Sequence, residues 1–236
     1  MTAAGPAPAR ADWTFDDLKQ VGLDFADPAE VASYDARQGD HTAEDEQVLA
    51  RLHIGRGDIV ADIGCGTGSL ACAGARRGAL VHAIDASPTM LAAAKARAAA
   101  CGAQTITFHQ ASFLTFDIVA PAHLITTKYA LHHLPDFWKG LALARMHAAL
   151  APGGRLYIED VVFSCAPRAL SETVETWIAW MLANTGYDRA AVAQHVREEH
   201  STFGWVMEGL IERAGFRLLT RHYDPPVYAT YLAERV

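Results

Sequence analysis

Hydrophobic positions along the central part of this chain alternate between short continuous runs and longer periodic runs. Short apolar runs, which are typical of strands buried on both faces, lie near residues 59–64, 80–85, 105–109, 123–128 and 155–161. Segments with apolar residues at helical spacing lie between them, near residues 67–78, 88–101 and 137–150. This alternation predicts a parallel sheet that binds its ligands at the carboxyl ends of its strands.

The segments on either side of this core follow other patterns. Residues 1–44 begin with an Ala/Gly/Pro-rich stretch and predict a frayed tail followed by a helical lid. Within this segment Tyr34 is a candidate to close over a site and to take part in catalysis. Residues 45–236 predict one α/β domain. A helix over 42–52 with a Thr42-x-x-Asp45 capping box crosses the boundary and leads into the first strand.

The alternation of strands and helices breaks again after the fifth predicted strand. Residues 164–203 predict an inserted helical cover, because an amphipathic helix over 167–184 precedes a second, polar helix over 187–200. A helix over 205–215 and a strand pair joined by Asp224-Pro225-Pro226 then complete the domain.

The turn after the first predicted strand carries the clearest chemical signal. In VADIGCGTG, residues 60–68, three glycines separate the end of a buried strand from the start of a helix. Glycine permits a positive φ and the close approach of a ligand, and a helix start offers unpaired N–H groups. Asp62 adds a carboxylate just before the turn, where it suits a cationic ligand group.

A second signal lies at the end of the next strand. LVHAID, residues 80–85, ends in Asp85, roughly 20 residues beyond the glycine turn, where an acid accepts hydrogen bonds from ribose hydroxyls. Strand, glycine turn, helix, strand and acid together predict a nucleoside site. A nicotinamide enzyme typically has G-x-G-x-x-G, whereas Gly68 follows Gly66 by two residues.

Four motifs in the expected order connect this nucleoside site to a known family. DIGCGTGSL at 62–70, Asp85, ALHHLPD at 130–136 and LAPGGRLYIED at 150–160 resemble the motifs of class I S-adenosylmethionine (SAM) dependent methyltransferases. The resemblance covers about residues 45–163. It implies a Rossmann-like, seven-stranded, mostly parallel sheet with an antiparallel last strand and helices on both faces. It also implies SAM as cofactor and S-adenosylhomocysteine as product.

The resemblance further implies which residues hold the cofactor. Asp62 and the first two glycines would hold the methionine part, Asp85 the ribose, and Ala86 and Met90 the adenine. Ser112 stands where many members of the family carry an acid. The complete predicted cofactor set is Asp62, Gly64, Cys65, Gly66, Gly68, Asp85, Ala86, Met90, Ser112, Phe113 and Thr127.

Other polar residues follow the fourth and fifth strands, where an acceptor would meet the methyl donor. His133 is a candidate general base, Asp160 is a candidate to face the substrate, and Tyr34 joins them as the third catalytic candidate. Lys128 would meet an anionic substrate group or form a salt bridge. The predicted substrate pocket comprises Lys128, Tyr129, His132, His200 and Trp205. Further aromatic candidates for its wall are Trp177, Trp180, Tyr187 and Tyr228.

Net charge, cysteine spacing and the length of apolar runs argue against several classes of function. The chain has 236 residues and a formal net charge of −7, and it has no Lys/Arg run, which argues against a nucleic-acid substrate. Its four cysteines form no C-x-x-C pair, so no metal site is expected. No apolar run reaches the length of a membrane span, and the N-terminus has no apolar signal core, so we expect a cytoplasmic protein.

The main prediction is therefore a methyltransferase that acts on N or O of a small molecule by in-line displacement. Two alternatives stay open: a methyltransferase of RNA or protein side chains, and a SAM-binding regulator without catalysis. A homodimer through the inserted helices is a further prediction, because Trp177, Ile178 and Trp180 together would form an apolar surface.

Overall fold

The computed structural model describes residues 12–19, 27, 29, 31, 32, 34, 37, 41–224 and 227–236. The greater part of the predicted tail and lid lies outside these residues, as do Pro225 and Pro226 of the last turn.

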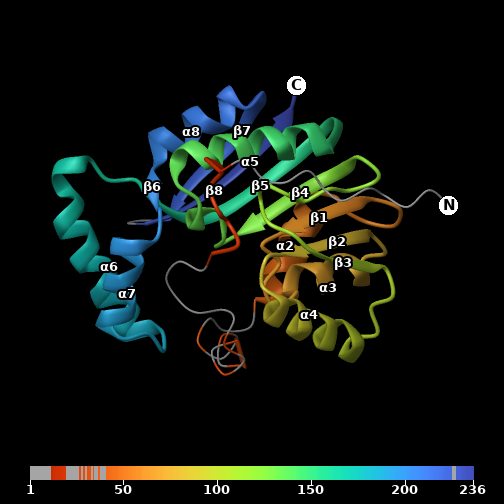
Figure 1. Ribbon diagram of the computed structural model, residues 1–236, viewed down its shortest axis with the longest axis horizontal. Helices are drawn as coiled ribbons and strands as arrows, with labels where there is room; N and C mark the ends of the chain where they lie inside the picture. The colour runs from red at the N-terminus through yellow and green to blue at the C-terminus, as the bar shows by residue number, and fades with distance from the viewer. Residues whose placement is uncertain are drawn as a thin grey trace.

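A single sheet forms the centre of the molecule (Figure 1). Along it the strands follow the order β3-β2-β1-β4-β5-β8-β7, and β6 pairs with the end of β5. Only β8, among the described strands, runs antiparallel to its neighbours β5 and β7. The predicted fold class is confirmed, with one short strand added. The strands are β1 Ile59–Ile63, β2 Leu80–Asp85, β3 Ile106–Gln110, β4 Ala122–Lys128, β5 Leu150–Phe163, β6 Thr202–Phe203, β7 Phe216–Asp224 and β8 Tyr228–Arg235.

Helices cover both faces of the sheet and its carboxyl edge. In Figure 1, α5 and α8 lie on one face, α3 and α4 lie on the other, and α6 and α7 stand apart at the left. The α-helices are α2 Thr42–Arg51, α3 Ser69–Arg76, α4 Pro88–Ala100, α5 Asp136–Ala149, α6 Leu170–Asn184, α7 Arg189–Glu198 and α8 Gly204–Arg213. Short 3₁₀ turns occur at Leu131–His133 and Pro167–Ala169.

Two local expectations were wrong. The helix α2 begins without a side-chain cap, because the Asp45 carboxylate is buried and bonded to Lys128 instead of closing a capping box. The strand β5 begins at Leu150 rather than near 155, because Leu150 already pairs with Ala122 and the ladder then skips over an irregularity to Arg155. The extra length adds nothing to the carboxyl end, where the site lies.

The helical cover is held by an apolar core of its own. Trp177 and Ile178 of α6 are each 3% exposed and pack with residues from the ends of β5 and β8. The apolar surface expected for dimerisation is therefore mostly buried inside the chain, and Trp180 alone of the three predicted residues is half exposed. Within the described residues, no helix has the length and hydropathy needed to cross a bilayer.

Candidate active site

The glycine turn forms the floor of a cavity at the carboxyl ends of β1, β2 and β4. Gly64 and Gly66 both have positive φ, at +73° and +52°, and both line this cavity. A Cβ on Gly64 would lie 2.4 Å from the Cβ of Ala130, so no larger residue fits there. A Cβ on Gly66 would meet no protein atom within 4 Å and would project into the cavity. The turn therefore leaves room for a ligand against bare backbone.

Asp85 braces this turn from the end of β2. Its Oδ2 accepts a hydrogen bond from the N–H of Gly66 at 2.9 Å, and its Oδ1 accepts one from the N–H of Ser87 at 2.8 Å. Ser87 in turn caps α4 by accepting from the N–H of Met90. The backbone of Ala86 also donates to the Asp85 carboxylate, whose remaining acceptor capacity is open to a ligand hydroxyl. The structure brings most of the predicted cofactor residues to this cavity, namely Gly64, Gly66, Asp85, Ala86, Met90, Ser112 and Phe113.

A second lobe, lined by the same two glycines, lies between them and the helices α2 and α3. Asp62 and Cys65 line it together with Gly64, Gly66 and Lys128. Burial raises the pKa of Asp62 to about 7, although the Thr126 hydroxyl donates a hydrogen bond to its Oδ1 at 2.9 Å. Such a buried carboxylate is stabilised when a cationic group binds beside it. This lobe suits an ammonium or sulfonium group.

Two predicted cofactor residues lie elsewhere for clear physical reasons. Gly68 packs against α4, since a Cβ there would lie 2.9 Å from the Cβ of Ala94, so this glycine permits helix packing rather than ligand contact. Thr127 is buried on the opposite side of β4 from Thr126, which is the residue that reaches Asp62. Strand alternation therefore turns Thr126 toward Asp62 and turns the predicted residue, Thr127, to the other face of the sheet.

Lys128 forms ion pairs within the protein. Its Nζ lies 2.7 Å from Asp45 Oδ1 and 3.5 Å from Glu159 Oε2. Burial alone would lower the pKa of Lys128, but these two carboxylates raise it. Of the two roles expected for Lys128, the structure shows the salt bridge. Its ion pairs join α2 to the carboxyl ends of β4 and β5.

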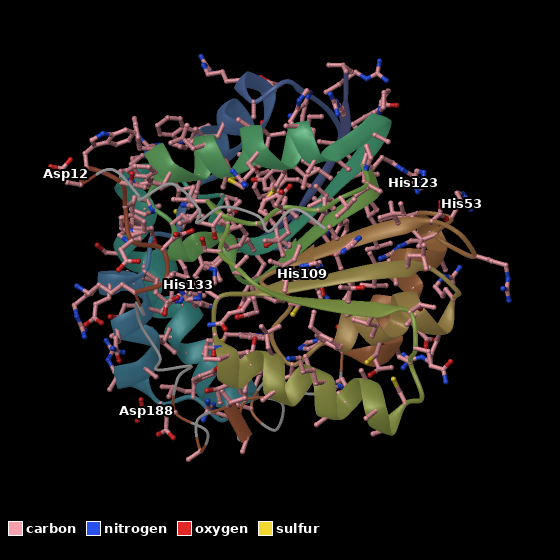
Figure 2. The ribbon with its side chains drawn as sticks, turned by 45° about the vertical axis from the view of Figure 1, so that its right-hand side comes forward. Asp12, His53, His109, His123, His133 and Asp188 are labelled. Atoms are coloured by element: carbon pink, nitrogen blue, oxygen red, sulfur yellow. The ribbon has the colours of Figure 1, made fainter. Side chains whose placement is uncertain are left out.

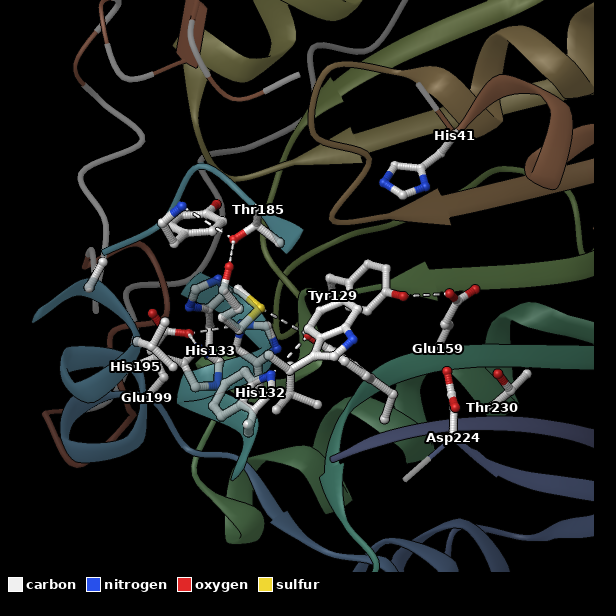
Figure 3. Close-up of a pocket in the computed structure, with 18 of the residues that line it drawn as sticks. His41, Tyr129, His132, His133, Glu159, Thr185, His195, Glu199, Asp224 and Thr230 are labelled. Atoms are coloured by element: carbon white, nitrogen blue, oxygen red, sulfur yellow. Dashed lines mark hydrogen bonds and ion pairs between the residues drawn. The ribbon is translucent and has the colours of Figure 1, made fainter. Parts of the chain in front are cut away.

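A larger cavity of about 410 Å³ adjoins the first and faces the helical cover (Figure 3). Tyr34 and Tyr129 line both this cavity and the two cofactor lobes, so they stand at the junction. Tyr129 has a φ of +50°, uncommon for a non-glycine residue, and its hydroxyl donates to Glu159 Oε1 at 2.6 Å. The aromatic residues in the wall are Tyr34, Tyr129, Trp177, Trp180, Tyr187 and Tyr228.

His132 anchors a buried polar cluster in the wall of this larger cavity. Its Nδ1 lies 2.5 Å from Asp160 Oδ1, and its Nε2 lies 3.0 Å from Glu199 Oε2. Burial alone would lower the pKa of His132, but Asp160 and Glu199 raise it to about 9. Burial would likewise raise the pKa of Asp160, but the adjacent imidazole of His132 holds it below its usual range. Asp160 therefore positions His132 and is not among the residues that line the cavity.

His133, the predicted candidate for a general base, lies between the two cavities. It lines both the cofactor cavity and the larger cavity, and Figure 2 places it near the helices of the cover. Burial, reinforced by the neighbouring His132, lowers the pKa of His133 to about 3. The imidazole is thus neutral at physiological pH.

Three residues predicted for the substrate pocket do not line the larger cavity. One of them, Lys128, lines the two cofactor lobes instead. Trp205 is 67% exposed and stacks on Phe203 at the start of α8. His200 acts through its backbone, because its N–H donates to the carbonyl of His132 at 2.7 Å and its own carbonyl accepts from Lys139. These bonds tie the end of the cover to the core.

Several lining residues were missed from the sequence. The N-terminal segment contributes Asp17, Leu18 and Lys19 to the cofactor cavity, and Asp17 accepts a hydrogen bond from the N–H of Leu114 at 3.0 Å. The cover contributes His195 and Glu199 to the larger cavity. The i, i+4 spacing of these last two could have placed them on one helix face, whereas nothing local marks the N-terminal contacts.

The sequence and the fold both have known relatives. Residues 60–154 match the family model described as a methyltransferase domain. An uncharacterized methyltransferase from Bacillus cytotoxicus is 30% identical over 159 residues, which make up 67% of this chain and 69% of that protein. An uncharacterized methyltransferase from Geobacillus kaustophilus is 33% identical over 134 residues, covering 56% of this chain and 60% of that protein.

Solved structures share the fold at low identity. A SAM-dependent methyltransferase from Aquifex aeolicus has a TM-score of 0.63 at 17% identity, with 89% of this chain and 99% of that chain covered. The magnesium protoporphyrin IX methyltransferase of Synechocystis, solved with S-adenosylhomocysteine, has a TM-score of 0.60 at 20% identity, with 84% of each chain covered.

Proposed function

This chain belongs to the class I SAM-dependent methyltransferases, and we propose that it transfers the methyl group to an oxygen or nitrogen of a small, flat molecule. One observation carries the choice of acceptor. The larger cavity of about 410 Å³ shares Tyr34, Tyr129 and His133 with the cofactor cavity, and its volume falls within the ordinary range for small-molecule sites. Aromatic side chains from both the core and the cover form its walls, which suits a planar acceptor.

The residues around the glycine turn fit the donor. Asp62, buried and with a raised pKa, would hold the cationic methionine end, and Asp85 would accept from the ribose hydroxyls. Met90 and Phe113 supply apolar surface for the adenine. The cofactor supplies an activated methyl group on a sulfonium.

The protein's own contribution to the chemistry is positioning. In-line displacement requires the acceptor atom to lie close to the methyl carbon and in line with it, and a closed, dry site favours the loss of charge from sulfur. Tyr34 and Tyr129 stand where the two cavities meet, and neutral His133 beside them is able to accept a hydrogen bond from an acceptor hydroxyl or amine. Asp160 acts indirectly, by fixing the orientation of His132.

Binding is the first test of this proposal. Calorimetric titration of the purified chain with SAM, S-adenosylhomocysteine and NADH should give micromolar binding of the first two and none of the third. Absence of SAM binding by a folded protein would contradict the assignment of the cofactor cavity.

Transfer is the second test. The protein is incubated with methyl-labelled SAM and a pool of aromatic hydroxy and amino compounds, and the products are separated by size. The label should appear in the low-molecular-mass fraction. Label that appears instead in RNA or protein from the same preparation would contradict the small-molecule assignment.

A further inference from the structure

Three side chains in the wall of the larger cavity converge on one point, and they come from two separate parts of the chain. His132 follows β4, whereas His195 and Glu199 lie in and just after α7 of the cover. Glu199 Oε2 lies 3.0 Å from His132 Nε2 and 2.5 Å from His195 Nδ1. All three ligand-type atoms lie within 4.8 Å of one another (Figure 3).

The outward nitrogen of each imidazole is already bonded to a partner. Asp160 Oδ1 lies 2.5 Å from His132 Nδ1, and Ser201 Oγ lies 2.9 Å from His195 Nε2. A metal-bound histidine usually donates its second N–H to a carboxylate or another oxygen, which fixes the ring and the nitrogen that ligates. Both imidazoles are therefore oriented so that their remaining nitrogens meet at Glu199.

We propose that His132, His195 and Glu199 bind a divalent transition-metal ion, with Zn²⁺ as the reference ion. Two imidazoles and one carboxylate are a ligand set of catalytic zinc sites, in which the fourth position stays open. Bonds of about 2.0–2.2 Å would hold the three ligand atoms roughly 3.4 Å apart, so only small side-chain shifts are needed. Imidazole ligands disfavour Mg²⁺ and Ca²⁺, which prefer oxygen.

The charge of the cluster is consistent with a cation. Two largely buried carboxylates flank the His132 imidazole, and of the two only Glu199 lines the cavity. Lys139 contributes positive potential at Asp160, but its ammonium is bonded to Asp136 and to the carbonyl of His200. A divalent ion would replace the proton of His132 and balance both carboxylates, and buried charges in proteins are paired or bind metals.

The open coordination position would face the acceptor, because all three ligands line the larger cavity. An acceptor with an oxygen or nitrogen donor would bind the ion there, and the ion would promote loss of its proton at neutral pH. This role rests on the proposed function, whereas the binding of the ion does not. Methyl transfer and metal binding are therefore measured separately.

The test is calorimetric titration of chelator-stripped full-length protein with Zn²⁺, Mn²⁺ and Mg²⁺. We expect one Zn²⁺ per chain, weaker Mn²⁺ binding and no Mg²⁺ binding. Glu199→Gln should weaken Zn²⁺ binding at least about tenfold, since even the loss of an outer-shell partner costs 10–100-fold. The matched control is Glu198→Gln, which alters the exposed neighbouring carboxylate and should leave Zn²⁺ binding unchanged.

A second measurement does not depend on how the variants fold. Co²⁺ bound to the wild-type protein should give the visible absorption of a four-coordinate or five-coordinate nitrogen and oxygen site, without the intense near-ultraviolet band of thiolate ligands. A SAM affinity equal to that of the wild-type protein shows, for each variant, that the cofactor half is intact. Absence of Zn²⁺ binding, equal binding by Glu199→Gln, or a thiolate band would each overturn the metal site while leaving SAM binding in place.

Discussion

The cofactor half and the acceptor half of this site are built in different ways. The cofactor cavity is formed mostly by short segments at the ends of consecutive strands, and backbone groups of Gly64 and Gly66 face it directly. The larger cavity, which we propose for the acceptor, is formed by long side chains that come from the core, the cover and the last two strands. The first half can therefore be read from local sequence, whereas the second depends on how distant segments pack.

The difference also concerns what a substitution can change. In the cofactor half a single added methyl group alters the space available to the ligand, because the backbone itself is the wall. In the acceptor half the walls are side chains that also pack against other residues. A single substitution there should therefore change the shape of the cavity and the affinity for the acceptor less.

Gly66→Val should abolish SAM binding, with a loss of affinity greater than about 100-fold, because its branched side chain would fill the cavity. The matched control is Gly102→Val, since Gly102 also has a positive φ and open space around its Cβ but lies in the turn after α4. Both variants carry similar backbone strain, so calorimetry should show lost SAM binding in the first and normal binding in the second. Equal SAM affinities would show that the glycine turn does not contact the cofactor.

Asp85→Ala should weaken SAM binding at least about tenfold, because charge-assisted hydrogen bonds contribute roughly 1.5–3 kcal/mol. The variant also removes the oxygens that hold the N–H groups of Gly66 and Ser87. Asp117→Ala, at an exposed loop carboxylate, serves as the control. Unchanged affinity in Asp85→Ala would refute the assignment of the ribose site.

Affinity for SAM should fall about tenfold between pH 8 and pH 6, as Asp62 gains a proton. The pKa of this buried carboxyl in the free protein is about 7, so it is mainly charged above that pH and mainly neutral below it. The charged form attracts the cationic methionine end, and the neutral form does not. Asp62→Asn should bind SAM more weakly at pH 8 and lose this pH dependence; a variant that keeps it would place the titrating group elsewhere.

Trp180→Ala should raise the KM for the acceptor about fivefold through the loss of buried aromatic surface, with no change in SAM affinity. Trp180 lines the acceptor cavity, whereas Leu182 on the same helix is equally exposed and does not line it. Leu182→Ala is therefore the matched control, and steady-state kinetics compare the two. A change in SAM affinity in Trp180→Ala would contradict the separation of the two halves.

The sequence predicted most of the fold because hydrophobic runs and glycine turns are local signals. Runs at strand spacing located seven of the eight strands; β6 has two residues and forms only because the chain returns beside β5. The start of β5 was missed because the Pro-Gly-Gly turn masks the pairing of Leu150 with Ala122. Strand pairing across long separations leaves little trace in a local pattern.

The candidate site was predicted unevenly for the same reason. Asp62, Asp85 and the first two glycines were predicted from local motifs and from the family that those motifs resemble. Thr126, rather than the predicted Thr127, donates a hydrogen bond to Asp62, because successive side chains of a strand point to opposite faces of the sheet. The meeting of His132 with Glu199 joins residues 67 positions apart in the chain, and only tertiary packing brings them together.

The pairing of β6 with β5 has an evolutionary consequence. Val162 pairs with Thr202 and Phe163 with Phe203, so the cover leaves the sheet and returns to it at adjacent points. A segment with such neighbouring ends can be exchanged for another without rearranging the strands around it, because the closure cost changes slowly with loop length. Recombination at this junction would let one donor-binding scaffold acquire new acceptors, and chimaeras joined at Phe163 and Thr202 are the natural way to engineer such a change.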